Sequence, residues 1–396
     1  MNSRRWVIVL AVVGVLHNAL RVIASILGSE WGYFNYLPLR TSKPFSGTAA
    51  IEIAGVLAVV AAVVWLAAGL WRNSLKPSPV WSSVIWAMGA GTLVGLVAVY
   101  ATMVARSYGW ILFVVTPFVM GVVSVLALAQ WREVTMADAL TMSTLAVVTL
   151  GVLLVAFAIE GIICLSMAIP IAIPIAILGG VIACFSQRRL VARTPMLLLV
   201  VVTVLPFGTS LESALRPAPR LFTVTTSIDI PVAPGRVWRT ILQPAKLAPP
   251  SHFLFRSGIA YPLASHIEGS GLTATRYCDF STGKLVEPVL IWDEGRRLRF
   301  TVVSNPLPLQ EWTPYARIHP PHLEGFLASR QGEFRIEPLA NGGTRLYATT
   351  WYQHHMWPAE YWRFWSDYII HRVHDMVLEN VRQRAEASAP AATFYK

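Results

Sequence analysis

Residues 222–238, FTVTTSIDIPVAPGRVW, contain the change of pattern that decides the fold of the second half of the chain. The first part, Phe222–Ile230, alternates and is rich in β-branched side chains, which is typical of a strand. Pro231 and Pro234 end this strand because proline lacks the backbone N–H that a strand ladder needs. Gly235–Leu242 then has the pattern of a short helix. The segment therefore predicts a domain that opens with one strand and one short helix.

The remainder of this half predicts a run of antiparallel strands and a closing helix. Alternating runs bounded by turn residues predict strands at 260–268, 272–280, 285–292, 297–303, 332–338 and 344–354. The sequences STG at 281–283 and NGG at 341–343 are typical of hairpin turns. An irregular, proline-rich stretch at 304–328 interrupts the strands, and a long helix at 359–387 follows them.

The sequence before this domain has the composition of a membrane protein. Of the whole chain, 55% is hydrophobic and 13% charged, and residues 1–215 hold only 12 basic and 6 acidic residues against 20 and 15 in the remainder. A membrane-spanning helix needs about 20 mostly apolar residues. Runs of about this length predict seven spans, at 6–27, 53–71, 80–105, 107–131, 139–159, 161–187 and 194–211. The first half is thus predicted to be an all-α bundle of about seven membrane helices.

Basic residues between the predicted spans indicate an orientation. With a cytoplasmic N-terminus, the cytoplasmic segments hold eight Lys and Arg residues and the opposite loops hold three. Seven crossings then place the C-terminal domain on the periplasmic side of a bacterial inner membrane. Within 139–187, Glu160-Gly161 falls where a turn between two helices is expected, and a re-entrant pair is the alternative.

Charge and cysteine patterns exclude several classes of protein. The formal net charge of +11 is shared between the two halves, and this does not favour nucleic acid binding. Cys164, Cys184 and Cys278 have no CxxC spacing, so neither a disulfide framework nor a zinc site is predicted. Phosphate-binding and dinucleotide-binding motifs are absent, and no cofactor or metal is predicted. The oligomeric state cannot be predicted from these residues.

Several motifs of the second half resemble the START-like SRPBCC superfamily, of the polyketide cyclase/dehydrase and lipid-transport type. IDIPVAPGRVW at 228–238 resembles the first strand and helix of that family, and GGTRLYATTWY at 342–352 resembles its last hairpin strand. YWRFWSDYIIHRVHDMVLENV at 361–381 resembles its closing helix. The resemblance covers about 222–386. It implies a helix-grip fold, in which a curved antiparallel sheet wraps a long C-terminal helix around an apolar cavity.

Together these patterns divide the chain into four parts. They are a transmembrane region at 1–215, a linker at 216–221, a START-like domain at 222–387 and a flexible tail at 388–396.

Two polar residues on adjacent predicted strands are the first site candidates. Glu287 lies in an otherwise apolar strand, and Arg276 lies on the preceding hairpin arm. A buried carboxylate is costly without a partner, so the favoured interpretation is a cross-strand ion pair. The alternative is a general base in a cyclase-like enzyme.

Histidines supply further candidates. His319 and His322, with Glu324, could bind a metal, but a rim loop over the cavity mouth is the favoured interpretation. His371 and His374, three apart on the closing helix, predict a solvated or membrane-facing polar stripe.

The predicted function is a membrane-tethered START-like domain that binds a hydrophobic small molecule or lipid near the bilayer. One alternative is a membrane-bound polyketide cyclase/dehydratase-like enzyme on an apolar substrate, with Glu287 and His322 as weak catalytic candidates. Another is a ligand-responsive membrane sensor. The predicted ligand contacts are Arg276, Glu287, Trp292, His319, His322, Trp365 and Ile369.

Overall fold

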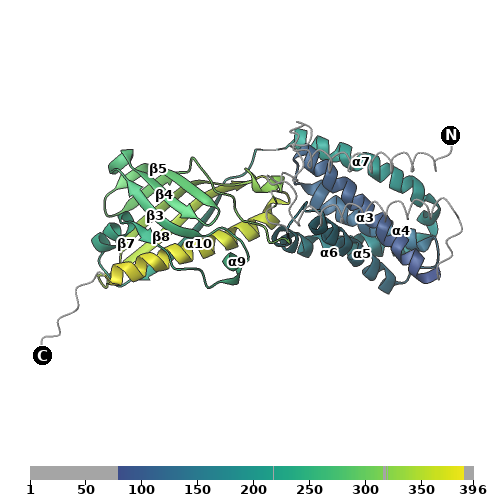
Figure 1. Ribbon diagram of the computed structural model, residues 1–396, viewed down its shortest axis with the longest axis horizontal. Helices are drawn as coiled ribbons and strands as arrows, with labels where there is room; N and C mark the ends of the chain where they lie inside the picture. Colours follow the sequence, from purple (N-terminus) through teal and green to yellow (C-terminus); the bar gives the residue numbers. More distant parts are fainter. Residues whose placement is uncertain (1–78, 217, 315–317, 319, 388–396) are drawn as a thin grey trace, which may run out of the picture. The chain divides into compact units, whose positions relative to one another are not determined.

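The computed structural model describes residues 79–216, 218–314, 318 and 320–387 (Figure 1). The chain divides into two compact units. The first comprises Met1–Arg216 and Glu311–Pro321, and the second comprises Pro217–Gln310 and His322–Lys396. The segment Glu311–Pro321 therefore groups with the first unit, although strands of the second unit flank it in the sequence. The spans predicted at 6–27 and 53–71, and the tail predicted at 388–396, lie outside the described residues.

The described part of the first unit is helical. Its helices are α3 (Pro79–Ala105), α4 (Thr116–Ala129), α5 (Met136–Ala156), α6 (Ile162–Leu190) and α7 (Thr194–Ala214). A π-helical turn, η2 (Ile111–Val115), precedes α4, and a short 3-10 turn, η3 (Val191–Arg193), precedes α7.

Four of these helical segments are long and apolar enough to cross a membrane, judged by length and composition. They are Trp81–Ala105, Ile111–Ala129, Met136–Ala156 and Ile162–Leu190. They coincide with the spans predicted at 80–105, 107–131, 139–159 and 161–187. The run 139–187 thus forms two helices, α5 and α6, and Pro170 and Pro174 lie inside α6. A total of seven spans stays a prediction.

Glycines allow two of these helices to approach closely. A Cβ atom on Gly121 of α4 would lie 1.8 Å from the carbonyl oxygen of Ala176 in α6. A Cβ atom on Gly179 of α6 would lie 2.1 Å from the carbonyl oxygen of Phe118 in α4. Small residues at such crossings let two backbones pack directly, as in many membrane helix pairs.

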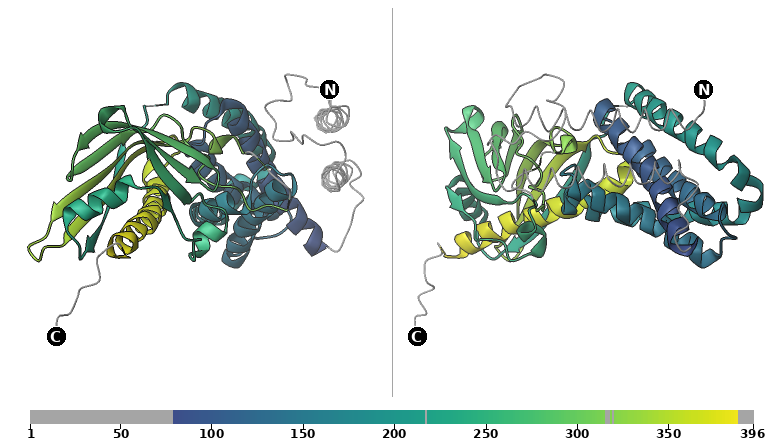
Figure 2. Two further views of the ribbon diagram at one scale, coloured as in Figure 1. Left: turned by 60° about the vertical axis from the view of Figure 1, so that its left-hand side comes forward. Right: turned by 45° about the vertical axis from the view of Figure 1, so that its right-hand side comes forward.

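The described part of the second unit is an antiparallel sheet of eight strands with three α-helices. In chain order the strands are β1 (Phe222–Ile230), β2 (Ala245–Lys246), β3 (Pro262–Glu268), β4 (Thr275–Phe280), β5 (Gly283–Asp293), β6 (Arg297–Thr301), β7 (Leu327–Pro338) and β8 (Thr344–His354). Their order across the sheet is β1-β8-β7-β6-β5-β4-β3-β2. The helices are α8 (Pro234–Leu242), α9 (Phe253–Arg256) and α10 (Ala359–Ala387). Figure 2 shows the curved sheet from two directions, with α10 along its concave side.

Alternation along the strands decides which side chains face α10. On β1, Val224 and Ile230 are buried, and Leu346 and Ala348 of the paired strand β8 are buried with them. A core forms where α8 and the C-terminal half of α10 pack against this face, with Trp238 of α8 in edge-to-face contact with Trp292 at 5.6 Å between ring centroids. The predicted helix-grip architecture is therefore present in the second unit. The sequence did not predict β2, α9 or the start of β7 at Leu327.

Candidate binding cavity

A cavity of about 170 Å³, counted as the space open to the centre of a water molecule, lies between the sheet and the middle of α10. By this measure a cavity needs about 10–15 Å³ to hold one water, so the space is large enough for several water molecules. Most of its wall is apolar. Prominent wall residues are Phe280, Leu285, Phe300, Phe334, Ile369 and Val373.

Two buried charged residues face each other on the cavity wall. Arg276 of β4 and Glu287 of β5 are register partners, and they form an ion pair. The guanidinium carbon of Arg276 lies 5.1 Å from the ring centroid of Phe300 and 5.5 Å from that of Phe334. Burial raises the pKa of the Glu287 carboxyl, and the adjacent Arg276 charge only partly opposes this. The cross-strand ion pair expected from the sequence is thus confirmed, and both partners line the cavity.

His374 of α10 is a further polar wall residue, and it is buried. Its Nδ1 atom lies 3.0 Å from the Thr226 hydroxyl of β1, and its Nε2 atom lies 2.8 Å from the Thr350 hydroxyl of β8. Burial, followed by the neighbouring His371, lowers the pKa of His374 to about 4. The prediction that His374 belongs to a solvated or membrane-facing stripe is therefore wrong, whereas His371 is exposed.

Glu333 of β7 also borders the cavity, but it is paired with Thr349, so strand alternation puts its side chain on the face of the sheet opposite to Gly332 and Phe334. It is buried, and its carboxylate accepts a hydrogen bond from Arg299 Nε at 2.7 Å. Arg299 in turn lies over the Trp351 ring, 4.5 Å from its centroid. Sequence reasoning missed Glu333 because its partner lies on another strand, 34 positions away.

The other predicted ligand contacts divide into three groups. Ile369 lines the cavity with Arg276 and Glu287. Trp292 and Trp365 are not wall residues: Trp292 packs on Trp238, and Trp365 packs on Phe364 at 5.5 Å between ring centroids. His322 is buried in a short 3-10 turn, η5 (Pro321–Leu323), away from the wall, and His319 lies outside the described residues. Ligand contact by these residues stays a prediction.

The predicted rim loop is present only in part. Asn305–Pro308 lines the cavity, and the Thr282 hydroxyl donates to the Leu307 carbonyl at 2.6 Å. The Asn305 side chain also exchanges two hydrogen bonds with the backbone of Ser329, at 2.9 and 3.2 Å. Of the predicted rim loop, the start of the irregular stretch therefore lines the cavity, whereas Glu311–Pro321 groups with the first unit.

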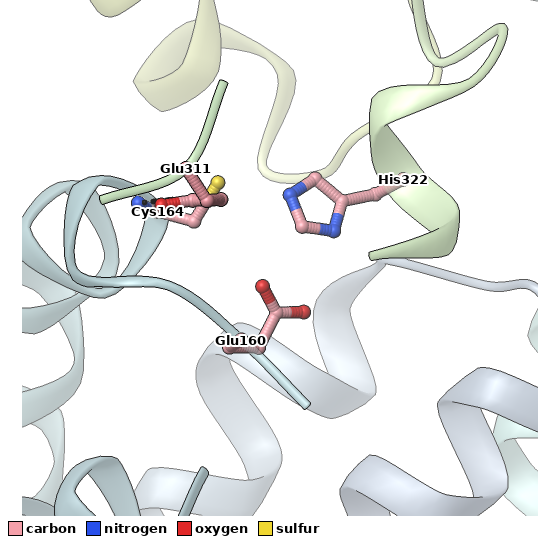
Figure 3. A group of neighbouring side chains, drawn as sticks. All are labelled: Glu160, Cys164, Glu311 and His322. Carbon is pink, nitrogen blue, oxygen red and sulfur yellow. Dashed lines mark hydrogen bonds between the residues drawn. The ribbon is translucent and has the colours of Figure 1, made fainter. Parts of the chain in front are cut away.

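Figure 3 shows polar side chains of the first unit, Glu160, Cys164 and Glu311. Ligand atoms of Glu160, Cys164 and Glu311 lie within 4.8 Å of one another. The Glu311 carboxylate accepts backbone N–H bonds from Ile163 and Cys164, both at 3.1 Å. The first N–H groups of a helix lack partners within it and favour a negative charge. Glu311 is thus an N-terminal cap of α6, which the sequence did not reveal.

The strand order, the curvature of the sheet and α10 place the second unit in the helix-grip class. No family model and no curated protein matches the chain.

Among solved structures, the chain is similar to norcoclaurine synthase from Thalictrum flavum in complex with dopamine and hydroxybenzaldehyde, with 8% identity, a TM-score of 0.30, and coverage of 43% of this chain and 90% of that one. It is also similar to the Zhui aromatase/cyclase from Streptomyces sp. R1128, with 15% identity, a TM-score of 0.28, and coverage of 44% and 99%. A third is Ara h 8.0201, with 10% identity, a TM-score of 0.26, and coverage of 43% and 100%. At these identities the similarity concerns the fold, and the substrates and activities named for these proteins are theirs.

Proposed function

We propose that the helix-grip unit binds a hydrophobic small molecule or lipid in the cavity, and that the apolar helices hold the unit at a bilayer. The observation that carries the proposal is the cavity itself, a largely apolar space between the curved sheet and α10. Transfer of apolar surface from water into such a space is favourable by about 25 cal/mol per Å². Pockets with apolar walls and a few placed polar groups are typical of small-molecule sites.

The geometry of Glu287 favours binding over catalysis. A general base needs a carboxylate that can reach the proton it removes. The Glu287 carboxylate instead accepts a hydrogen bond from Arg276, and both side chains are buried in the wall. The ion pair connects β4 and β5 at the cavity, and its two opposite charges leave this part of the wall electrically neutral.

Four apolar helices and a short connection support the proposed tether. Only residues 215–221 separate the end of α7 from the start of β1. Fully extended, seven residues span at most about 25 Å. A poorly soluble ligand could then move between the bilayer and the cavity with little exposure to bulk water.

Native mass spectrometry of the full chain, purified from its host membrane, tests the binding proposal. Wild type is expected to retain a small apolar molecule. Val373→Trp, which fills the cavity from α10, should lose it, and Tyr368→Trp, on the exposed side of the same helix, should retain it. Equal retention by both variants, or no bound molecule in wild type, contradicts the proposal.

The side of the membrane is a separate proposal. An odd number of crossings from a cytoplasmic N-terminus puts the helix-grip unit in the periplasm. Alkaline phosphatase fused after Lys396 should then be active, and a green fluorescent protein fusion at the same position should be dark. The opposite pattern contradicts this orientation.

A further inference from the structure

The charges on the cavity wall are already paired. Arg276 pairs with Glu287, and Glu333 pairs with Arg299. Within the part of the chain that the structure describes, Arg276, Glu287 and Glu333 are the charged residues of the lining apart from His374, whose buried ring is neutral near pH 7. An ionic ligand group would lose its hydration in the cavity without gaining a counter-ion, which is costly. The wall therefore favours an uncharged occupant.

The Thr350 hydroxyl is a polar group of the wall that retains unused hydrogen-bonding capacity, and unlike the Ser329 hydroxyl, which lies beside the rim residue Asn305, it is held by a buried side chain of α10. The Thr350 hydroxyl faces His374 Nε2 at 2.8 Å, and within the described residues it has no second partner. A hydroxyl offers one hydrogen and two lone pairs, so one bond to the imidazole leaves capacity for another. Thr350 follows the inward alternation of β8, between the buried residues Ala348 and Tyr352. The free capacity is thus available on the cavity side of the sheet.

His374 and its partners form a chain of hydrogen bonds that holds Thr350. Thr226 lies 2.7 Å from Nδ1 of His371 and 3.0 Å from Nδ1 of His374. Because the Thr226 hydroxyl has one hydrogen, it donates to one imidazole and accepts from the other. The whole chain His371–Thr226–His374–Thr350 can therefore run in either direction.

Each direction presents a different group to the cavity. When His371 donates to Thr226, His374 donates through Nε2 to Thr350, and the Thr350 hydrogen is free for a ligand oxygen. When the direction reverses, Thr350 donates to His374 Nε2 and its oxygen accepts from a ligand hydroxyl. The first arrangement suits a carbonyl or a hydroxyl, and the second suits a hydroxyl.

We propose that Thr350, held by His374, is a hydrogen-bonding site of the cavity, and that the occupant is an uncharged apolar molecule with a hydroxyl or carbonyl oxygen. This inference rests on the proposed function, since it presupposes that the cavity accepts an apolar ligand. It names the chemical class of that ligand and the wall, at α10 and β8, where its oxygen lies.

Three probes with the same ring system separate the parts of the inference. They are naphthalene, 2-naphthol and 2-naphthoate, which share one apolar ring system and differ only in the polar substituent. Binding is measured by equilibrium dialysis at pH 7.4 with the full chain in lipid nanodiscs. Discs that carry Val373→Trp serve as the reference for partition into lipid.

Wild type is expected to bind 2-naphthol about threefold to tenfold more tightly than naphthalene, as one net hydrogen bond provides. It should bind 2-naphthoate more weakly than 2-naphthol, because the carboxylate finds no unpaired cation. Thr350→Val, which keeps the shape of the side chain, should bind both naphthalene and 2-naphthol with the affinity that wild type has for naphthalene. His374→Phe should also reduce the preference.

Thr225→Val is the matched control, because the Thr225 hydroxyl bonds Thr349 at 3.0 Å on the exposed face. It should keep the preference for 2-naphthol. Equal binding of naphthalene and 2-naphthol by wild type overturns the inference but leaves the proposed function intact, and so does a preference that survives in Thr350→Val. Saturable binding of none of the three probes overturns the proposed function as well.

Discussion

The middle and the C-terminal part of α10 face the same sheet but differ in what lies between the helix and the strands. From Leu378 to Ala385 the helix packs on a continuous apolar core, to which α8 contributes Val237 and Trp238. From Ile369 to Val377 it faces the cavity. The comparison shows how a helix-grip domain can be both stable and hollow. The short helix α8 fills the space under the C-terminal part of α10 and so supplies the core, whereas no helix of the described chain fills the space under the middle of α10, which remains a cavity.

The largest expected effect on stability comes from truncating the α8 side chain that fills the core, Trp238. Trp238→Ala deletes a ring that is 4% exposed in the core and should lower the free energy of unfolding by about 3–5 kcal/mol. Thermal unfolding of the full chain, followed by near-ultraviolet circular dichroism, measures the change. A loss below about 1 kcal/mol would show that packing of α8 does not account for the difference between the C-terminal part and the middle of α10.

Acid should lower the stability of the folded protein through His374, which lies on the cavity wall. The pKa of His374 is about 4 in the folded protein and about 6.5 in the unfolded chain, so the unfolded state binds more protons between these values. Stability should therefore fall as the pH drops from 6.5 to 4, by at most about 3 kcal/mol, and should be unaffected by this group above that window.

Thermal midpoints of wild type and His374→Gln at pH 7.5 and 4.5 check this expectation. The variant should lose less stability on acidification than wild type does. His354, whose pKa is also lowered by burial, adds a contribution of the same sign in both proteins. An equal loss in the two proteins would show that His374 is not responsible.

A glycine on the wall should have an intermediate effect. A Cβ atom on Gly332 would lie 2.2 Å from the Phe300 ring, so Gly332→Ala must displace that ring. Overpacking of this kind costs about 1–3 kcal/mol. Gly235→Ala is the control, because no atom lies within 4 Å of its added Cβ. Chemical denaturation should separate the two variants, and equal midpoints would contradict the expectation.

The smallest effect is expected on the cavity wall of α10. Ile369→Ala removes apolar atoms that already border a space, so no new enclosed void forms. The expected loss is about 1 kcal/mol, below the 2–5 kcal/mol expected for Leu378→Ala in the filled C-terminal part. The same unfolding measurements compare the two variants. An equal or larger loss for Ile369→Ala would mean that the middle of α10 is packed like its end.

Sequence patterns predicted features that depend on neighbouring residues. Alternation located β1 and β8, and the hairpin between β4 and β5 brought Arg276 opposite Glu287, only 11 positions away. β2 has two residues and α9 has four, which is too short for periodicity to emerge. These elements are fixed by tertiary contacts such as the bond from Asn380 to the Lys246 carbonyl.

The polar part of the site depended on distant partners. His374 meets Thr226 across 148 positions of sequence, and Glu311 caps Ile163 across the same separation. The three-residue spacing of His371 and His374 predicted that both lie on one side of the helix, but it did not predict which residues surround them. A usable sign was the inward register of Thr226 and Thr350 among apolar neighbours, since two inward hydroxyls on adjacent strands need a polar partner from the covering helix.

Because Glu311 caps α6, the helix-grip unit cannot be separated from the helices by a single truncation. The chain passes between the units after Arg216, again after Gln310 and once more after Pro321. A truncated protein that begins at β1 would carry the eleven residues Glu311–Pro321 without the backbone N–H groups of Ile163 and Cys164 that they serve. A water-soluble version should therefore replace this excursion with a short glycine-serine bridge between Gln310 and His322, as well as removing the helices.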